Sequence, residues 1–310
     1  MIQQIDRRSF VKASLLPAVW SLSAGWTTHT QVASGREAAA GTPQGPEIID
    51  TNVHLFDWPF RRLKYARTGP LVEKLRGHRI TQAWAGSFEA VLQKQLDGVN
   101  RRLAEECRIA GDGMLLPFGS VNPAWPDWEE DLRRCDEQHR MPGIRLYPGY
   151  HGYTLDHPEF VRLLAVAAQR GLLVQIAIRL EDERVHHPTL DAPLVDAAPL
   201  PGILKQVPSA RVQLINSGEA LHGRHVLDLV RDTQATFDIA AIEGNGGLGR
   251  LIDGTHPTYD GPVGVERLLF GSHAPYFPCE SALMKLFESP LVLGQLQQLM
   301  RGNAERLLAV

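Results

Sequence analysis

The chain has 310 residues, with 32 Lys and Arg against 35 Asp and Glu, a formal net charge of -3 and 44% hydrophobic residues. These values are ordinary for a globular protein. They exclude a disordered chain, a collagen-like repeat and a strongly basic nucleic-acid binder. We therefore expect a folded protein with no nucleic-acid partner.

The first 40 residues combine a charged start, a short apolar middle and a small-residue end. Residues 7–12 read RRSFVK, a weakly apolar run covers residues 13–26, and residues 38–40 form a cleavage site of the A-x-A type. The run is too short and too polar to span a bilayer stably, and no other segment looks transmembrane. The pattern resembles a twin-arginine export signal, in which Asp6 and Val11 replace the usual Ser or Thr and Leu.

This resemblance implies three segments. Residues 1–40 are expected to be a signal peptide, residues 41–46 a linker, and residues 47–310 the exported domain, located in the periplasm. A disordered basic tail and an uncleaved membrane tether are the alternatives for the first segment.

The chain contains three cysteines, Cys107, Cys135 and Cys279. Their odd number and wide spacing fit neither a disulfide framework nor a CxxC metal site. We expect buried free thiols, with a catalytic cysteine as the alternative.

From residue 47 onward, short apolar runs alternate with amphipathic stretches. The apolar runs predict strands over residues 48–54, 80–86, 115–121, 143–147, 172–178, 212–216, 236–243 and 268–272. Helical spacing of apolar residues predicts helices over residues 90–108, 128–139, 158–169 and 281–287. Apolar strands that alternate with helices indicate a parallel sheet covered on both faces. Eight such strands predict an α/β fold, namely a single-domain (β/α)8 TIM barrel, with a doubly wound sheet as the alternative.

Polar residues stand at the carboxyl ends of the predicted strands, where a barrel of this type carries its active site. Asp50, Asn52 and His54 alternate along the first strand and therefore share one face. Later strand ends add Ser120, Asn122, Arg145, Tyr147, Gln175, Arg179, Asn216, Asp238, Glu243 and His273. Because the ends of parallel strands converge, we expect these side chains to line one polar pocket.

Three motifs carry a family resemblance. The first strand reads Ile-Ile-Asp-x-x-x-His and ends at His54, the eighth reads Leu-Phe-Gly-Ser before His273, and residues 302–308 read GNAERLL. Together they resemble the amidohydrolase superfamily, in particular its amidohydrolase-related TIM-barrel group of decarboxylases, lactonases and hydrolases. The resemblance covers residues 47–310 and implies a small-molecule substrate and a divalent, zinc-like metal at the barrel mouth.

The metal-ligand positions of that family are altered in this sequence. The family's His-x-His on the first strand reads Asn52-Val53-His54, and its Asp after Gly-Ser on the eighth strand is His273. Gln175 and Asn216 stand where the family often has His. Amide oxygens are poor zinc ligands. A metal at this position would therefore depend on His54 and His273 together with a carboxylate.

The residues leave three functions open. The first is a metal-independent hydrolase of a small carboxylated lactone, ester or amide, in which His54 or His273 activates water and Glu243 is a third catalytic candidate. The second is an atypical metal-dependent hydrolase or decarboxylase that uses His54 and His273. The third is a barrel that binds a small molecule without catalysis. A homo-oligomer is compatible with all three.

The substrate-binding residues expected from the strand ends are Asn52, Arg145, Tyr147, His151, Gln175, Arg179 and Asn216. An Arg would hold a substrate carboxylate through two hydrogen bonds, and Asn side chains would polarise a carbonyl. Structural alternatives exist for two features. Arg145 could form an internal salt bridge, and residues 147–153 could form a rigid turn instead of a substrate lid. Residues 186–187 follow a charged run and are predicted to lie in a surface loop.

Overall fold

The computed structural model describes residues 47–218, 224–257 and 261–309. Its eight parallel strands neighbour one another in chain order. They are β1 (Ile48–Leu55), β2 (Ile80–Ser87), β3 (Leu115–Gly119), β4 (Gly143–Leu146), β5 (Leu173–Ala177), β6 (Arg211–Ile215), β7 (Thr236–Asp238) and β8 (Leu268–Leu269). The expected signal peptide (residues 1–40) and linker (41–46) lie outside the described residues.

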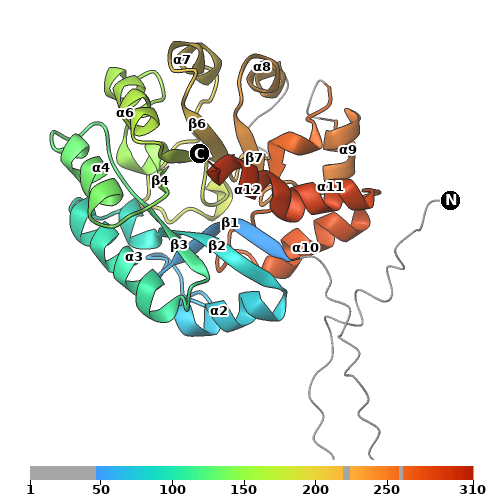
Figure 1. The fold of residues 1–310 in the computed structure, drawn as a ribbon, viewed down its shortest axis with the longest axis horizontal. Coiled ribbons are helices and arrows are strands. Elements are labelled where there is room, and N and C mark those ends of the chain that lie inside the picture. The colour runs from blue at the N-terminus through green and yellow to red at the C-terminus, as the bar shows by residue number, and fades with distance from the viewer. Residues whose placement is uncertain (1–46, 219–223, 258–260, 310) are drawn as a thin grey trace, which may run out of the picture. The chain divides into compact units, whose positions relative to one another are not determined.

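Helices alternate with the strands and surround them (Figure 1). The longer ones are α2 (Thr68–Gly77), α3 (Leu96–Ala110), α4 (Trp128–Glu137), α6 (Pro158–Gln169), α7 (Leu200–Gln206), α8 (Arg224–Asp232), α9 (Gly247–Asp253) and α10 (Cys279–Glu288). Shorter elements are η1 (Phe88–Val91), α5 (Pro148–His151), η2 (Glu183–Val185), η3 (Val265–Arg267), α11 (Leu293–Gln297), η4 (Gln298–Gly302) and α12 (Asn303–Leu308). None of the helices in the described ranges is long and apolar enough to cross a membrane.

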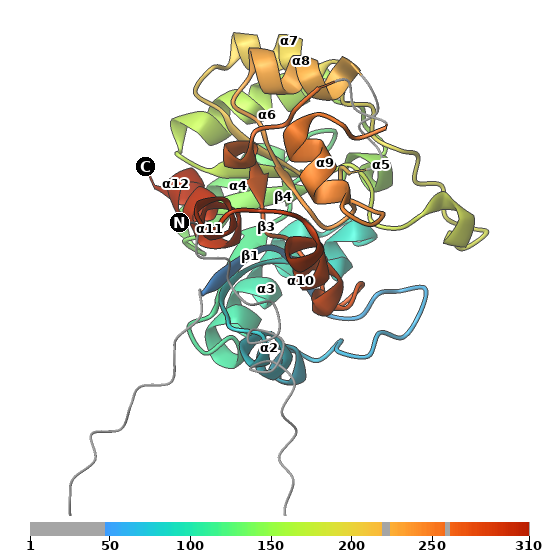
Figure 2. The ribbon, with the colours of Figure 1, turned by 90° about the vertical axis from the view of Figure 1, so that its right-hand side faces the viewer.

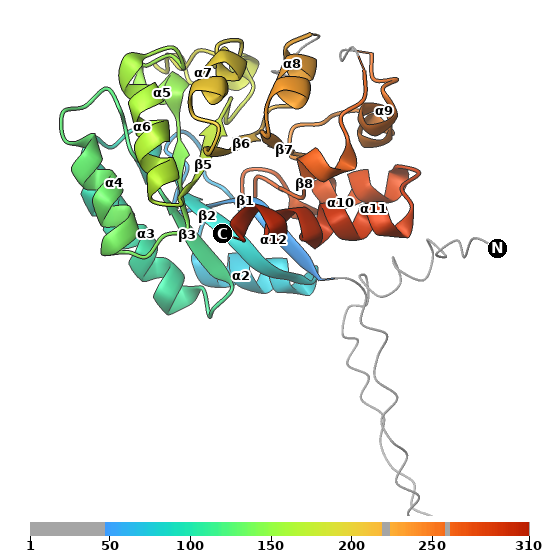
Figure 3. The same cartoon turned by 45° about the horizontal axis from the view of Figure 1, so that its top comes forward.

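Backbone hydrogen bonds join the last strand to the first. The Thr51 amide donates to the Phe270 carbonyl over 2.9 Å, and the His273 amide donates to the Asn52 carbonyl over 2.8 Å. Figure 3 shows β8 beside β1. The strands therefore form a nearly closed ring, and the predicted (β/α)8 barrel with a single domain over the described residues is confirmed.

Apolar packing closes the amino end of the ring. At the amino ends of the strands, inward side chains such as Trp84 and Phe118 pack with Ala304 of α12, which closes this end. In Figure 2, the loops that follow β1 and β5 extend from the opposite end. Those loops surround the carboxyl ends of the strands and so determine what can reach the barrel interior.

Some predicted boundaries were wrong. The strands that were expected over residues 115–121, 236–243 and 268–272 end earlier, at Gly119, Asp238 and Leu269. The prediction extended β7 too far because the apolar residues that follow the strand are also buried, in the mouth of the barrel. The helix expected from residue 90 begins at Leu96, because the turn η1 occupies the preceding residues. The three cysteines are buried and free, as predicted.

Candidate active site at the carboxyl end of the barrel

The structure brings His54 and His273 together although the sequence separates them widely. Their ring centroids lie 5.1 Å apart in an edge-to-face arrangement, and both side chains are fully buried. His54 stacks on Phe88 with ring centroids 4.5 Å apart, and His273 stacks on Tyr276 at 4.9 Å. Each histidine therefore has an aromatic ring on one of its faces.

Burial keeps both histidines neutral. The pKa of His54 is lowered well below its usual value by burial, and further by the positive charge of Arg145. Burial lowers the pKa of His273 to about 3. The Nε2 atom of His273 lies 2.8 Å from the Leu180 carbonyl, to which it donates, while Nδ1 faces the Asn216 amide at 3.5 Å. An imidazole with so low a pKa is a weak general base at neutral pH.

Arg145 lies inside the barrel with its guanidinium fully buried. Its Nη1 donates to the Val53 carbonyl over 2.7 Å, its Nη2 to the Trp84 carbonyl over 3.0 Å and its Nε to Gln175 Oε1 over 2.8 Å. The same Nη1 lies 3.2 Å from Nε2 of His54. The expected substrate-binding Arg145 thus binds the barrel's own backbone.

Amide and carboxylate groups form a second buried network. The Asn52 amide donates to Asn216 Oδ1 over 2.8 Å and to Asp238 Oδ2 over 2.6 Å. Asp50 Oδ1 accepts hydrogen bonds from the backbone amides of Asn52 and Ser272, which ties β1 to the segment after β8. Burial raises the pKa of Asp50 to about 7 and that of Asp238 to about 6. The side-chain amides of Asn52 and Asn216 are therefore hydrogen-bonded to each other and to other groups of the barrel.

The donors of the barrel interior do not fit the divalent metal that the family resemblance implies. The guanidinium of Arg145 lies against His54, the ligand that the sequence resemblance predicts, and would repel a metal cation. Asn52 and Gln175 offer neutral amide oxygens, which are weak ligands for a divalent metal, and the Gln175 Oε1 atom already accepts a hydrogen bond from Arg145 Nε. Within the described residues, three or more His, Cys, Asp or Glu side chains come close enough to share an ion only at His78, Cys279 and Glu280, outside the strand ring.

Aromatic side chains cover the two histidines. Trp58, in the loop after β1, packs against Phe88 with ring centroids 5.2 Å apart and against Tyr276 at 5.7 Å. Tyr147 also lies near His54, with ring centroids 6.1 Å apart. All four aromatic side chains are at most 7% exposed. His54 and His273 therefore lie behind an aromatic wall in this structure.

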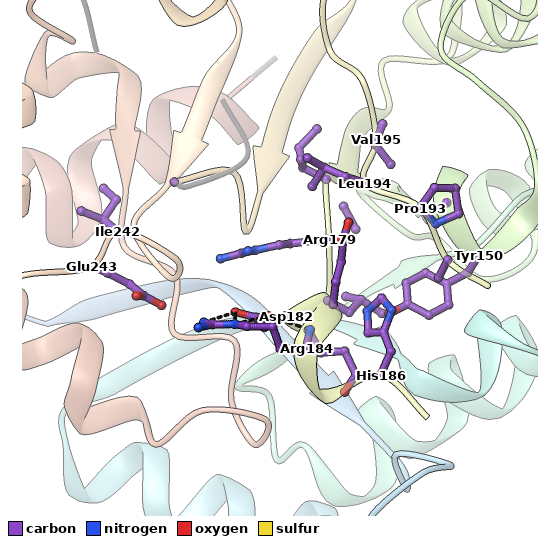
Figure 4. Close-up of a pocket in the computed structure, with 18 of the residues that line it drawn as sticks. Tyr150, Arg179, Asp182, Arg184, His186, Pro193, Leu194, Val195, Ile242 and Glu243 are labelled. Carbon is purple, nitrogen blue, oxygen red and sulfur yellow. Dashed lines mark hydrogen bonds and ion pairs between the residues drawn. The ribbon is translucent and has the colours of Figure 1, made fainter. Parts of the chain in front are cut away.

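An open cavity of about 400 Å³ lies beside this wall, at the carboxyl ends of β5 to β7. Arg179 enters it after β5, and Glu243 after β7 (Figure 4). In Figure 4 the Arg179 side chain extends across the cavity toward the segment that carries Glu243. Arg184 also contributes to the lining and pairs with Asp182 over 2.6 Å.

The expected site residues therefore divide into two groups. Arg179 and Glu243 line the cavity. The others form the interior network or the walls around it: His54, His273, Asn52, Arg145, Tyr147, Gln175, Asn216 and His151. His151 stacks on Trp125 at 6.0 Å, and its Nε2 lies 2.8 Å from the Ala90 carbonyl, so its loop is anchored on both sides.

The sequence interpretation missed the contribution of residues 181–186. The sequence predicts a surface loop for residues 186–187, which follow a charged run, yet His186 lines the cavity together with Glu181 to Arg184. Glu181 is only 4% exposed, and its Oε2 accepts a hydrogen bond from the Tyr276 hydroxyl over 2.7 Å. Its Oε1 has no hydrogen-bond partner. A buried carboxylate in a charged loop has no distinct signature in the sequence, because its neighbours Asp182 to Arg184 are polar and more exposed.

Comparison with known proteins places these observations in a family. The family profile described as amidohydrolase matches residues 49–214. No curated protein matches significantly. Among solved structures, the 5-carboxyvanillate decarboxylase of Sphingomonas paucimobilis superposes with a TM-score of 0.66 at 14% identity, covering 85% of this chain and 99% of that one.

Two further structures show the same likeness. The 2,6-dihydroxybenzoate decarboxylase of Rhizobium superposes with a TM-score of 0.60 at 14% identity, covering 86% of this chain and 98% of that one. The 5-carboxyvanillate decarboxylase of Novosphingobium aromaticivorans, which has bound manganese, superposes with a TM-score of 0.63 at 14% identity and the same coverage. At such identities the likeness establishes the fold alone. The profile match spans more than half of the sequence, and the chain therefore belongs to the amidohydrolase family.

Proposed function

We propose that this protein is an enzyme that hydrolyses a small carboxylated lactone, ester or amide in the cavity beside the aromatic wall. The observation that supports this most directly is the meeting of Arg179 and Glu243 in one cavity at the carboxyl ends of the strands. Enzymes with this barrel carry their active sites at that end. A guanidinium and a carboxylate in one cavity supply an anchor for a substrate carboxylate and a base for water.

The proposed roles follow from the charges of the two groups. The planar Arg179 guanidinium binds the substrate carboxylate through two hydrogen bonds and fixes the carbonyl relative to Glu243. Glu243 accepts a proton from water while the water oxygen bonds to the carbonyl carbon. The C–O or C–N bond then breaks, and the proton passes from Glu243 to the departing oxygen or nitrogen.

His54 and His273 have a positioning role in this proposal instead of the catalytic role expected from the sequence. Their low pKa values and the aromatic wall argue against a base at either position. His273 donates to the carbonyl of Leu180, next to Glu181 in the cavity lining. His273 therefore influences the cavity by fixing the backbone next to Glu181.

Decarboxylation is the second candidate, because the solved structures that superpose on this chain include decarboxylases of aromatic carboxylates. In that reaction the C–C bond to the carboxyl group breaks, carbon dioxide leaves, and the carbon atom takes a proton from an acid. Protonated Glu243 would supply that proton. Arg179 would bind the same substrate carboxylate in both reactions.

The test is a screen of the purified full chain against carboxylated lactones, esters, amides and hydroxybenzoates, with products identified by mass spectrometry. We expect hydrolysis products that disappear in Glu243→Gln and persist in Glu137→Gln, an exposed carboxylate on α4. Release of carbon dioxide would favour decarboxylation. Turnover that survives Glu243→Gln but not His273→Gln would refute the assignment of the base, and saturable binding without turnover would favour a non-catalytic barrel.

A further inference from the structure

Three potential metal ligands meet outside the strand ring, at the contact between α2 and α10. His78 follows the last turn of α2, and Cys279 and Glu280 begin α10. His78 Nε2 lies 3.3 Å from Glu280 Oε1, and Cys279 Sγ lies 3.5 Å from Glu280 Oε2. One ligand atom from each residue lies within 4.8 Å of the other two.

We propose that His78, Cys279 and Glu280 bind a divalent cation of the zinc type. Imidazole nitrogen, thiolate sulfur and carboxylate oxygen are the three donor types that zinc selects in proteins. Ligand atoms around a tetrahedral zinc ion are separated by roughly 3.3–3.8 Å, given bond lengths of about 2.0–2.3 Å. The distances from His78 and Cys279 to Glu280 fall within that range, although they end on different carboxylate oxygens, and the three ligand atoms lie within 4.8 Å of one another. Side-chain rotations would therefore bring the three ligand atoms around one ion. Water completes the four-coordinate shell.

The charges of the three residues suit a divalent ion. The thiolate and the carboxylate together carry two negative charges, and the imidazole binds in its neutral form. The Sγ proton of Cys279 leaves to solvent when the sulfur–metal bond forms. Cys279 is almost fully buried whereas His78 and Glu280 are partly exposed, so an ion can enter from the outside of the barrel.

Lys74 is the competitor for this position. Its ammonium group on α2 forms an ion pair with Glu280 Oε1, the oxygen that lies nearest to His78. A bound cation would displace Lys74 from that oxygen, because two cations cannot share it at contact distance without strong repulsion. Removal of the lysine charge should therefore strengthen metal binding.

The position of the site suggests what the ion does. The helix α2 follows β1 and α10 follows β8, so the two helices flank the seam at which the barrel closes. An ion held by residues of both helices would link them and stabilise the folded state by mass action. This role is separate from the proposed chemistry in the cavity, whose lining contains none of the three residues.

The experiment is a titration of the metal-free full chain with Co²⁺, which gives a thiolate-to-metal absorption band only when sulfur is a ligand, followed by displacement with Zn²⁺. We expect about one equivalent of Co²⁺ per chain with this band. Cys279→Ala should abolish the band, and His78→Ala should weaken binding at least tenfold. Lys74→Met should tighten binding, and Cys107→Ser, which changes another buried thiol, should leave it unchanged.

Two results would overturn the proposal. The first is the absence of the band in both the wild type and Lys74→Met. The second is stoichiometric metal that persists in Cys279→Ala and is lost in His54→Ala, which would place the ion in the barrel interior. The melting temperature with and without Zn²⁺ gives an independent readout, since a shift should occur in the wild type and be lost in His78→Ala.

Discussion

Nη1 of Arg145 lies 3.2 Å from Nε2 of His54 in the interior of the barrel. His54 is the first-strand residue for which the sequence resemblance predicts a retained metal-ligand position, and a fixed positive charge stands against it. Gly86 on β2 makes this arrangement possible. A Cβ atom at residue 86 would lie 2.7 Å from both Cδ and Nη1 of Arg145.

We therefore expect Gly86→Ala to destabilise the protein by about 1–3 kcal/mol, because the added methyl group overpacks a buried guanidinium that is held by three hydrogen bonds. Urea unfolding measures the change. Gly77→Ala is the matched control, since a Cβ atom there meets nothing within 4 Å and alanine favours the helix. Equal free energies of unfolding for the two variants would contradict the close packing around Arg145.

The raised pKa of Asp50, about 7 against 3.8 for the unfolded chain, predicts a pH-dependent stability. Between about pH 4 and pH 7 the folded state keeps a proton on Asp50 that the unfolded state has lost. This contribution is present in full below pH 4 and is lost as the pH rises through 7. His54 and His273 have lowered pKa values, so their contribution to the free energy of unfolding instead increases as the pH rises to about 6.5.

The Asp50→Asn variant loses the contribution of Asp50 to the pH dependence but keeps that of the two histidines, so it separates the two. The free energy of unfolding of the wild type relative to this variant should rise as the pH falls from 7 to 4, as measured by urea unfolding at several pH values. A difference that does not change with pH would show that Asp50 has an ordinary pKa. Asp232→Asn, which alters an exposed ion pair, is the control.

The proposed anchor predicts a KM effect. Arg179→Met should raise KM for a carboxylated substrate at least about tenfold, equivalent to about 1.4 kcal/mol, with a smaller change in kcat. Arg184→Met is the matched control, since this largely exposed side chain pairs with Asp182 at the edge of the cavity. If both variants raise KM equally, the cavity attracts the substrate by its overall charge, and Arg179 has no specific role.

The export signal predicts a processed N-terminus. When the chain is produced in a bacterium with a twin-arginine pathway, the periplasmic protein should begin near Gly41, as read by N-terminal sequencing. The double variant Arg7→Lys, Arg8→Lys should remain in the cytoplasm. Periplasmic protein that still begins at Met1 would refute the predicted cleavage, and unchanged export of the double variant would refute the twin-arginine assignment.

The strand and helix pattern was readable from the sequence because burial repeats locally. Runs such as residues 173–177, which are apolar except for Gln175, identify strands that are covered on both faces, and the helix predicted over residues 158–169 has those bounds in the structure. The same order of elements implied a barrel and placed His54 and His273 at its carboxyl end. The meeting of these two rings followed from topology alone.

The accessibility of those residues depended on the tertiary structure. Trp58 follows His54 closely in the chain and Tyr276 follows His273, but these two loops, which are far apart in sequence, meet over the histidines only in the fold. Arg145 extends into the space beside Gly86. Part of the cavity lining, including Glu181, comes from a loop whose composition resembles an exposed surface. Sequence periodicity reports whether a position is buried. The direction of a long side chain and the groups that cover it are decided by contacts between segments far apart in the chain, which no local pattern encodes.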